Sequence, residues 1–139
     1  MILLDTNVLS AVMRRANEPA VERWLDAQPT EAVWTTSITL FEVRFGLALL
    51  APGRRRNRLG HAFTRAIDEI LEGRVLPFDQ EAAQASAEIA ARQRLAGRPV
   101  EIRDVQIAGI AAAHGATLAT RNIRHFEGIG IRLVDPWTA

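Results

Sequence analysis

The sequence has 139 residues, of which 48% are hydrophobic and 24% charged, and its formal net charge is +1. This size fits a single domain over residues 1–139, and no apolar run approaches the roughly 20 residues that a membrane-spanning helix needs. The chain has no cysteine, and all 17 of its basic residues are arginine, which excludes disulfides, catalytic thiolates and lysine-based mechanisms.

The first predicted element is a strand at residues 1–4, which ends abruptly at Asp5. No basic residue precedes this apolar run, and a carboxylate interrupts it, so we expect no signal peptide, a cytoplasmic location and no membrane partner. Short apolar runs predict further strands at residues 32–36, 74–78, 116–120 and 131–134.

The segments between these strands carry apolar residues at helical spacing. Pro19 suits a first helical turn, Gly73 ends a long helix that begins near Arg54, and Asp79 caps a helix that runs to about Leu95. Strands and helices therefore alternate. This alternation predicts an α/β fold with three αβα layers around a mostly parallel central sheet of about five strands.

One predicted helix, from Leu40 to Leu50, is apolar around nearly its whole circumference. Such a helix must be buried on more than one side. The sheet covers one side, and the cover for the other is either a second subunit or the Arg54–Leu71 helix of the same chain.

Three acids lie where predicted strands or loops give way to helices: Asp5, Glu42 and Asp104. Ligands of open α/β sheets gather outside the carboxyl ends of the strands, where such side chains can converge. Separated carboxylates without cysteine or lysine suit a hard divalent cation, Mg²⁺ or Mn²⁺. Hydrolysis of a phosphodiester needs little more, because substrate phosphates complete the coordination.

Each acid also has a purely structural interpretation. Asp5 could be an ordinary helix N-cap, Glu42 could close a capping box with Thr39, and Asp104 could favour the positive end of its own helix. The sequence leaves these alternatives open for each acid taken alone.

At this point the chain resembles the PIN-domain family, and within it the VapC-type toxins of bacterial toxin–antitoxin pairs. The resemblance spans almost the whole chain and rests on the order and spacing of several short segments. These are Ile2–Val8, Ser37–Gly46, Leu76–Asp79, Asp104–Ala108, Leu118–Asn122 and Asp135–Trp137.

The resemblance implies a PIN-like domain with metal-dependent endoribonuclease activity on an RNA substrate, a homodimer, and a cognate antitoxin that holds it inactive. Asp5, Glu42 and Asp104 would form the catalytic acidic cluster. Asp5 and Asp104 would be the main ligands of Mg²⁺ or Mn²⁺, and Glu42 would act on metal-bound water. Thr6 and Thr120 would offer hydroxyls, and Asn7 would hold the turn after the first strand.

The chain departs from the family at one position. Members often carry a fourth acid at the position of Asn122 or of His125, and neither residue is acidic here. Asn122 can still offer an amide oxygen, and a neutral His125 can bind manganese or hold a water. The departure weakens the case for a second protein-bound metal ion.

The run Arg54-Arg55-Arg56 begins a predicted helix, where the helix dipole disfavours positive charge. Contact with RNA phosphates or with an acidic partner would explain the run, and so would compensation of Asp68, Glu69 and Glu72.

Three rival functions differ from an RNA nuclease. A phosphatase or receiver domain normally uses a lysine that this chain lacks. A catalytically weakened PIN-like binding module would explain the missing fourth acid but not the retention of the other three. A nuclease that acts on DNA leaves no distinguishing motif in the sequence.

Overall fold

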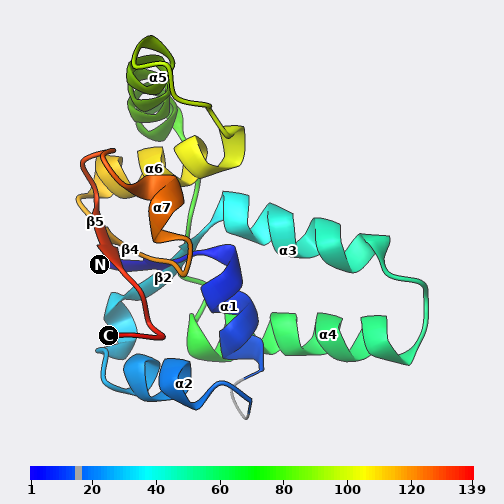
Figure 1. Ribbon diagram of the computed structural model, residues 1–139. Coiled ribbons are helices and arrows are strands. Elements are labelled where there is room, and N and C mark those ends of the chain that lie inside the picture. The colour runs from blue at the N-terminus through cyan, green and yellow to red at the C-terminus, as the bar shows by residue number, and fades with distance from the viewer. Residues whose placement is uncertain (15–16) are drawn as a thin grey trace.

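The computed structural model of the protein describes residues 1–14 and 17–139, which fold around a five-stranded sheet (Figure 1). The strand order is β3-β2-β1-β4-β5, and every neighbouring pair is parallel. The strands are β1 (Ile2–Leu4), β2 (Val33–Thr36), β3 (Val75–Leu76), β4 (Thr117–Ala119) and β5 (Arg132–Val134). All five lie within the segments predicted from the sequence, although most are shorter by one or two residues.

Helices cover both faces of this sheet, because residues of a strand alternate between its two sides. Leu4 packs with α1, α2, α3 and α4 on one face, whereas Leu3 packs with α5 and α6 on the other. The predicted αβα layering is therefore confirmed. The helices are α1 (Thr6–Met13), α2 (Pro19–Asp26), α3 (Ser37–Leu49), α4 (Arg54–Arg65), α5 (Gln80–Leu95), α6 (Ile102–His114) and α7 (Ile123–Phe126), with short turns η2 (Thr30–Ala32) and η3 (Ala66–Ile70).

Several helix ends follow the predicted signals. The carboxylate of Asp79 accepts a hydrogen bond from the backbone N–H of Ala82 at 3.0 Å, which caps α5. Gly115 ends α6 in the left-handed conformation, with a φ of 60°. The long helix predicted from Arg54 is not α-helical throughout, because α4 ends at Arg65 and the π-helical segment η3 follows it before Gly73.

Helices α5 and α6 pack closely because α6 carries glycine at the point of contact. A Cβ atom built on Gly109 would lie 2.7 Å from the carbonyl oxygen of Ala82 and would collide with the Oγ of Ser86. This packing fixes α6, and so the acid in its first turn, against the rest of that layer.

Helix α3 is only partly covered by its own chain. Helix α4 packs beside it, with the guanidinium of Arg44 lying 4.8 Å from the ring centroid of Phe63. Phe41, Phe45 and Leu49 nevertheless remain 55%, 42% and 74% exposed. The two helices form a hairpin that projects from the body of the molecule (Figure 1). Burial by the following helix of the same chain therefore accounts for only part of the apolar circumference of α3.

The order in which the chain adds strands reverses at a defined point of the sheet. The chain moves from β1 to β2 and β3 on one side, then returns to β4 and β5 on the other. Ligands of open α/β sheets bind outside the carboxyl ends of the strands where the order reverses, which here is between β1 and β4. Across the part of the chain that the structure describes, no helix combines the length and apolar character that spanning a membrane would require.

Candidate functional site

Asp5 lies at this reversal point, directly after β1, and is only 6% exposed. Its Oδ1 accepts a hydrogen bond of 2.8 Å from the backbone N–H of Thr6, so the carboxylate caps α1 as one structural interpretation proposed. Its Oδ2 accepts a second bond of 2.8 Å from the hydroxyl of Thr120, the residue that follows β4. The two bonds hold both carboxylate oxygens in one orientation between neighbouring strands.

Glu42 approaches the same edge from α3. Its Oε1 accepts a hydrogen bond of 3.0 Å from the hydroxyl of Thr6, and its Oε2 lies 3.6 Å from the guanidinium of Arg103. The alternative of a capping box with Thr39 is wrong, because the N-cap of α3 is Thr36, whose side chain accepts from the N–H of Thr39. Glu42 is therefore directed toward Thr6 and not toward the start of its own helix.

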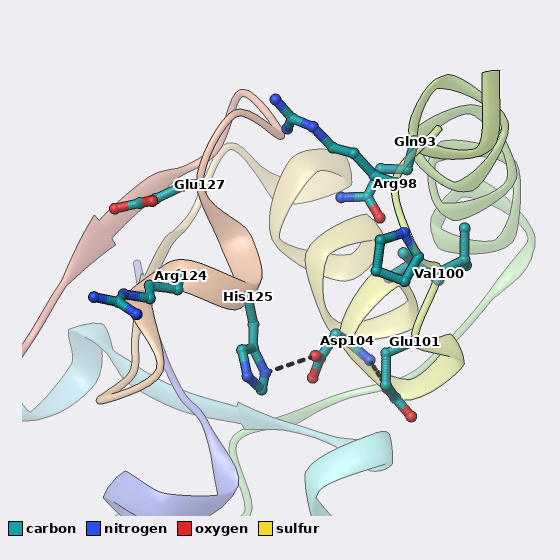
Figure 2. A pocket seen from close by; sticks show the side chains of 10 residues that line it. Gln93, Arg98, Val100, Glu101, Asp104, Arg124, His125 and Glu127 are labelled. Atoms are coloured by element: carbon teal, nitrogen blue, oxygen red, sulfur yellow. Dashed lines mark hydrogen bonds and ion pairs between the residues drawn. The ribbon is translucent and has the colours of Figure 1, made fainter. Parts of the chain in front are cut away.

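Asp104 lies in the first turn of α6 and completes the set of acids. Its backbone N–H donates to Glu101 Oε2 at 2.9 Å, which makes Glu101 the N-cap of the helix. Its carboxylate points the other way, toward α7, where Oδ2 lies 3.0 Å from Nδ1 of His125 (Figure 2). The carboxylate thus remains free of the helix backbone and available to the site.

Two asparagines lie beside these acids, Asn7 in the first turn of α1 and Asn122 at the start of α7. The Oδ1 of Asn7 accepts a hydrogen bond of 3.2 Å from the backbone N–H of Arg121, which joins the start of α1 to the segment after β4. The backbone N–H of Asn122 donates to Thr120 Oγ1 at 3.0 Å. Among the described residues, the side chain of Asn122 makes no hydrogen bond. Of the two positions where family members often carry a fourth acid, only that of His125 therefore has a side chain in contact with an acid here.

The three acids influence one another electrostatically. Burial raises the pKa of Asp5, while hydrogen bonds from Thr120 and Thr6 oppose the rise. Burial also raises the pKa of Glu42, and the negative charges of Asp5 and Asp104 add to that increase. The pKa of Asp104 is raised by burial, then by the charges of Glu101 and Asp5, and is lowered by His125. The three carboxylates therefore form one cluster, here called the acidic cluster: Asp5, Glu42 and Asp104.

The acidic cluster fits a hard divalent cation. Asp5 is a buried carboxylate that forms no ion pair with an arginine or histidine in residues 1–14 and 17–139, and the charge of His125 offsets its burial only in part. The carboxylates of Asp5, Glu42 and Asp104, together with the hydroxyls of Thr6 and Thr120, supply the oxygen ligands that Mg²⁺ and Mn²⁺ prefer. No group of three or more acidic or histidine side chains within the described ranges is already gathered tightly enough to enclose an ion. Such an ion would therefore be held by one or two carboxylates, with water or substrate oxygens as the other ligands.

Two residues of the site were not predicted from the sequence. Arg103 pairs with Glu42, and Glu101 caps the helix of Asp104. Glutamate is an unusual N-cap, so the pattern at the start of α6 did not indicate it. The position of Arg103 next to Asp104 was visible in the sequence, but its direction toward another helix depends on how α3 and α6 meet.

Known proteins resemble this chain over nearly its whole length. The family model described as PIN domain matches residues 2–130. The chain is 39% identical over 137 residues to VapC ribonuclease Y4jK of Sinorhizobium fredii, covering 99% of this chain and 98% of that protein. It is 36% identical over 137 residues to Toxin FitB of Neisseria gonorrhoeae, covering 99% of each. The crystal structure of FitAcB from Neisseria gonorrhoeae matches with a TM-score of 0.89 and 36% identity over 100% of both chains.

Proposed function

The chain belongs to the PIN domain family, and on this premise we propose that it is a divalent-metal-dependent endoribonuclease, the toxin of a toxin–antitoxin pair. The names of its relatives, VapC ribonuclease and Toxin FitB, support this activity and role. The observation that carries the proposal is the acidic cluster at the β1–β4 edge of the sheet. We propose further that residues 1–139 form a single PIN-like domain, since both core layers are built on one sheet.

In this proposal Asp5 and Asp104 hold the cation, Mg²⁺ or Mn²⁺, through carboxylate oxygens. When bound, such an ion lowers the pKa of a water molecule and neutralises charge on the scissile phosphate. Thr120 and the N–H of Thr6 keep the Asp5 carboxylate in place, as their 2.8 Å hydrogen bonds indicate.

Glu42 accepts or directs a proton of the attacking water in the same proposal. The Thr6 hydroxyl fixes one of its oxygens at 3.0 Å, while Arg103 stays 3.6 Å from the other. A raised pKa brings a carboxylate closer to neutral pH and makes it a better proton acceptor. His125 occupies one position of the missing fourth acid and directs the Asp104 carboxylate through its 3.0 Å contact.

The rival of a catalytically weakened binding module is less well supported. A relic without catalysis gains nothing from three carboxylates that repel one another and resist burial. In this chain the carboxylates still repel one another, because the charges of Asp5 and Asp104 each raise the pKa of Glu42. A cation that offsets this cost is the simplest reason for keeping all three.

The arginine run at the tip of the α3–α4 hairpin is proposed as an RNA contact. Arg54 and Arg55 are exposed, and no ion pair within the described residues joins the run to Asp68 or Glu69. Glu72 pairs instead with Arg74, at 3.6 Å. Compensation of these acids therefore does not explain the run.

Replacing Arg54, Arg55 and Arg56 together with glutamine is expected to weaken RNA binding and flatten its dependence on salt. Fewer counterions are released when fewer phosphates are neutralised, so the slope of log K against log salt should fall by about 2 to 3. Turnover at saturating RNA should change little, because the run lies at the free end of the hairpin, away from the sheet (Figure 1). Fluorescence anisotropy over a salt series measures the slope. An unchanged slope would assign the run to a protein partner.

The exposed apolar stripe of α3, formed by Phe41, Phe45 and Leu49, is proposed as the antitoxin contact. It begins next to Glu42, and the guanidinium of Arg103 lies 5.9 Å from the ring centroid of Phe41 while also pairing with Glu42. A partner that covers this stripe can therefore reach the acidic cluster with a basic side chain. Inhibition and binding would then be physically linked. A homodimer is proposed as well.

Phe45→Asp is expected to weaken antitoxin binding by about tenfold or more, because it places a charge in the buried part of the contact. The fold should persist, since the side chain is 42% exposed in the free chain. Leu95→Asp is the matched control, because Leu95 is 88% exposed on α5 and should leave binding unchanged. Calorimetry with purified antitoxin measures the affinities. Loss of dimerisation with normal antitoxin binding would instead make the stripe a subunit interface.

A further inference from the structure

A pocket of about 480 Å³ opens beside the acidic cluster, between α7 and the segment that leads into α6. Asp104 and His125 line one end of it, and Gln93 and Arg98 lie toward the other (Figure 2). Its volume is within the range of roughly 300–1,000 Å³ that small-ligand pockets occupy. It is therefore large enough for a substrate group that adjoins the reacting phosphate.

One polar side chain of this pocket, that of Gln93, is not used by the fold. The side-chain amide of Gln93 is only partly exposed, yet it makes no hydrogen bond among the described residues. An amide offers both donors and an acceptor, which matches the mixed edge of a nucleobase. The Gln93 side chain is therefore available to pair with the edge of a base that enters the pocket.

Arg98 closes the far end of the pocket. Its Nη1 would lie 2.9 Å from a Cβ atom at Gly128, whose φ of +76° is also a conformation that favours glycine. A glycine at this position lets the guanidinium lie against the loop after α7, so that it spans from one wall to the other. A guanidinium plane is one of the surfaces on which unstacked RNA bases pack.

The charge and shape of the remaining wall favour an uncharged planar group. Pro99 and Val100 are apolar, and the imidazole of His125 provides a second flat surface. The pocket's arginines, Arg98 and Arg124, are offset by Glu101, Glu127 and Asp104 around the same space. A phosphate would meet these carboxylates, whereas a base would not be repelled.

We propose that this pocket is a base-selective subsite that receives one nucleobase of single-stranded RNA next to the scissile phosphate, with Gln93 reading its edge and Arg98 covering its face. The inference rests on the proposed ribonuclease function and extends it to the choice of cleavage sequence. Single-stranded RNA is the natural ligand, because its bases can be turned out of the stack and read individually.

The test compares cleavage of single-stranded RNA oligonucleotides that differ only in the nucleotide on either side of the cut site. The wild-type chain is expected to prefer one base at one flanking position by about tenfold, and Gln93→Ala to reduce that preference to about twofold or less. Arg98→Ala should raise KM for the preferred RNA with little effect on kcat. Gln84→Ala and Arg94→Ala are matched controls on exposed positions of α5 outside the pocket, and both should retain the wild-type preference.

Equal cleavage of all four bases by the wild-type chain, or an undiminished preference in both pocket variants, would overturn the subsite while leaving the nuclease intact. If no RNA is cleaved, the proposed function fails, and binding of the same oligonucleotides by anisotropy in metal-free buffer still decides the subsite. Base-dependent affinity that Gln93→Ala removes would support it, and base-independent affinity would contradict it. Pocket variants that lose antitoxin binding but keep base preference would assign the pocket to the protein partner.

Discussion

Asp5→Asn is expected to reduce RNA cleavage by on the order of 100-fold or more while the protein stays folded. The substitution removes the buried carboxylate to which we assign the cation. Asparagine can still accept from the N–H of Thr6, and its amide can donate to the Thr120 hydroxyl, which has a second lone pair beside the one used by Asn122. The local hydrogen bonds can therefore re-form around the neutral side chain.

Stability should change in the direction opposite to activity. Burial raises the pKa of Asp5 above its ordinary value of 3.8, so its ionised form is less favourable in the folded chain than in the unfolded one. Protonated Asp5 therefore stabilises the folded chain below pH 3.8, and this contribution is lost as the pH rises through the raised pKa of Asp5 in the folded chain. At neutral pH, Asp5→Asn removes that cost, and the melting temperature in metal-free buffer should hold or rise.

A thermal melt with and without Mn²⁺ separates the two effects. The wild-type melting temperature should rise with Mn²⁺, because a ligand that binds only the folded state stabilises it, and Asp5→Asn should lose that response. Asp68→Asn, an exposed acid on η3 outside the acidic cluster, is the control and should behave as the wild type. Normal cleavage by Asp5→Asn would contradict the assignment.

Glu42→Gln is expected to lower kcat by roughly 10- to 100-fold with little change in stability. Glutamine retains the length of the side chain and can accept from the Thr6 hydroxyl, which lies 3.0 Å from Glu42 Oε1. It cannot accept a proton from water, and it loses the charge that faces Arg103. Single-turnover kinetics at saturating metal measure the chemical step directly.

The control for this substitution is Glu88→Gln, on the exposed surface of α5, which should keep full activity. Full activity in Glu42→Gln would leave Glu42 with a structural role only, and the proton would have to pass through another group. A loss of activity together with a large fall in melting temperature would also contradict the catalytic role, because it would show that Glu42 stabilises the fold.

The sequence was sufficient to predict the layers and the edge of the sheet that carries the site. Apolar runs such as Ile2–Leu4 are short and uninterrupted, as expected for parallel strands buried on both faces, and the intervening helices carry their own end signals. Asp5 and Thr120 follow neighbouring strands, so their meeting is a consequence of strand order. Periodicity alone does not give that order, which was not predicted and comes from the structure.

What the sequence could not provide was the direction of side chains between helices. The spacing of Thr39 and Glu42 fits a capping box, but the helix begins three residues earlier than that box requires, at Ser37, so Thr36 becomes the cap. Glu42 is then free to meet Thr6, which lies 36 positions away in the chain. His125 and Arg103 were likewise unpredictable as partners, because each contact crosses between separate helices.

The most direct test of the acidic cluster is cleavage of single-stranded RNA by the purified wild-type chain across a metal series. We expect cleavage in Mg²⁺ or Mn²⁺, loss of cleavage after chelation with EDTA, and recovery when the ion is returned in excess. Undiminished cleavage in EDTA, or no cleavage with either ion, would contradict the account of Asp5, Glu42 and Asp104 as a metal-dependent ribonuclease site.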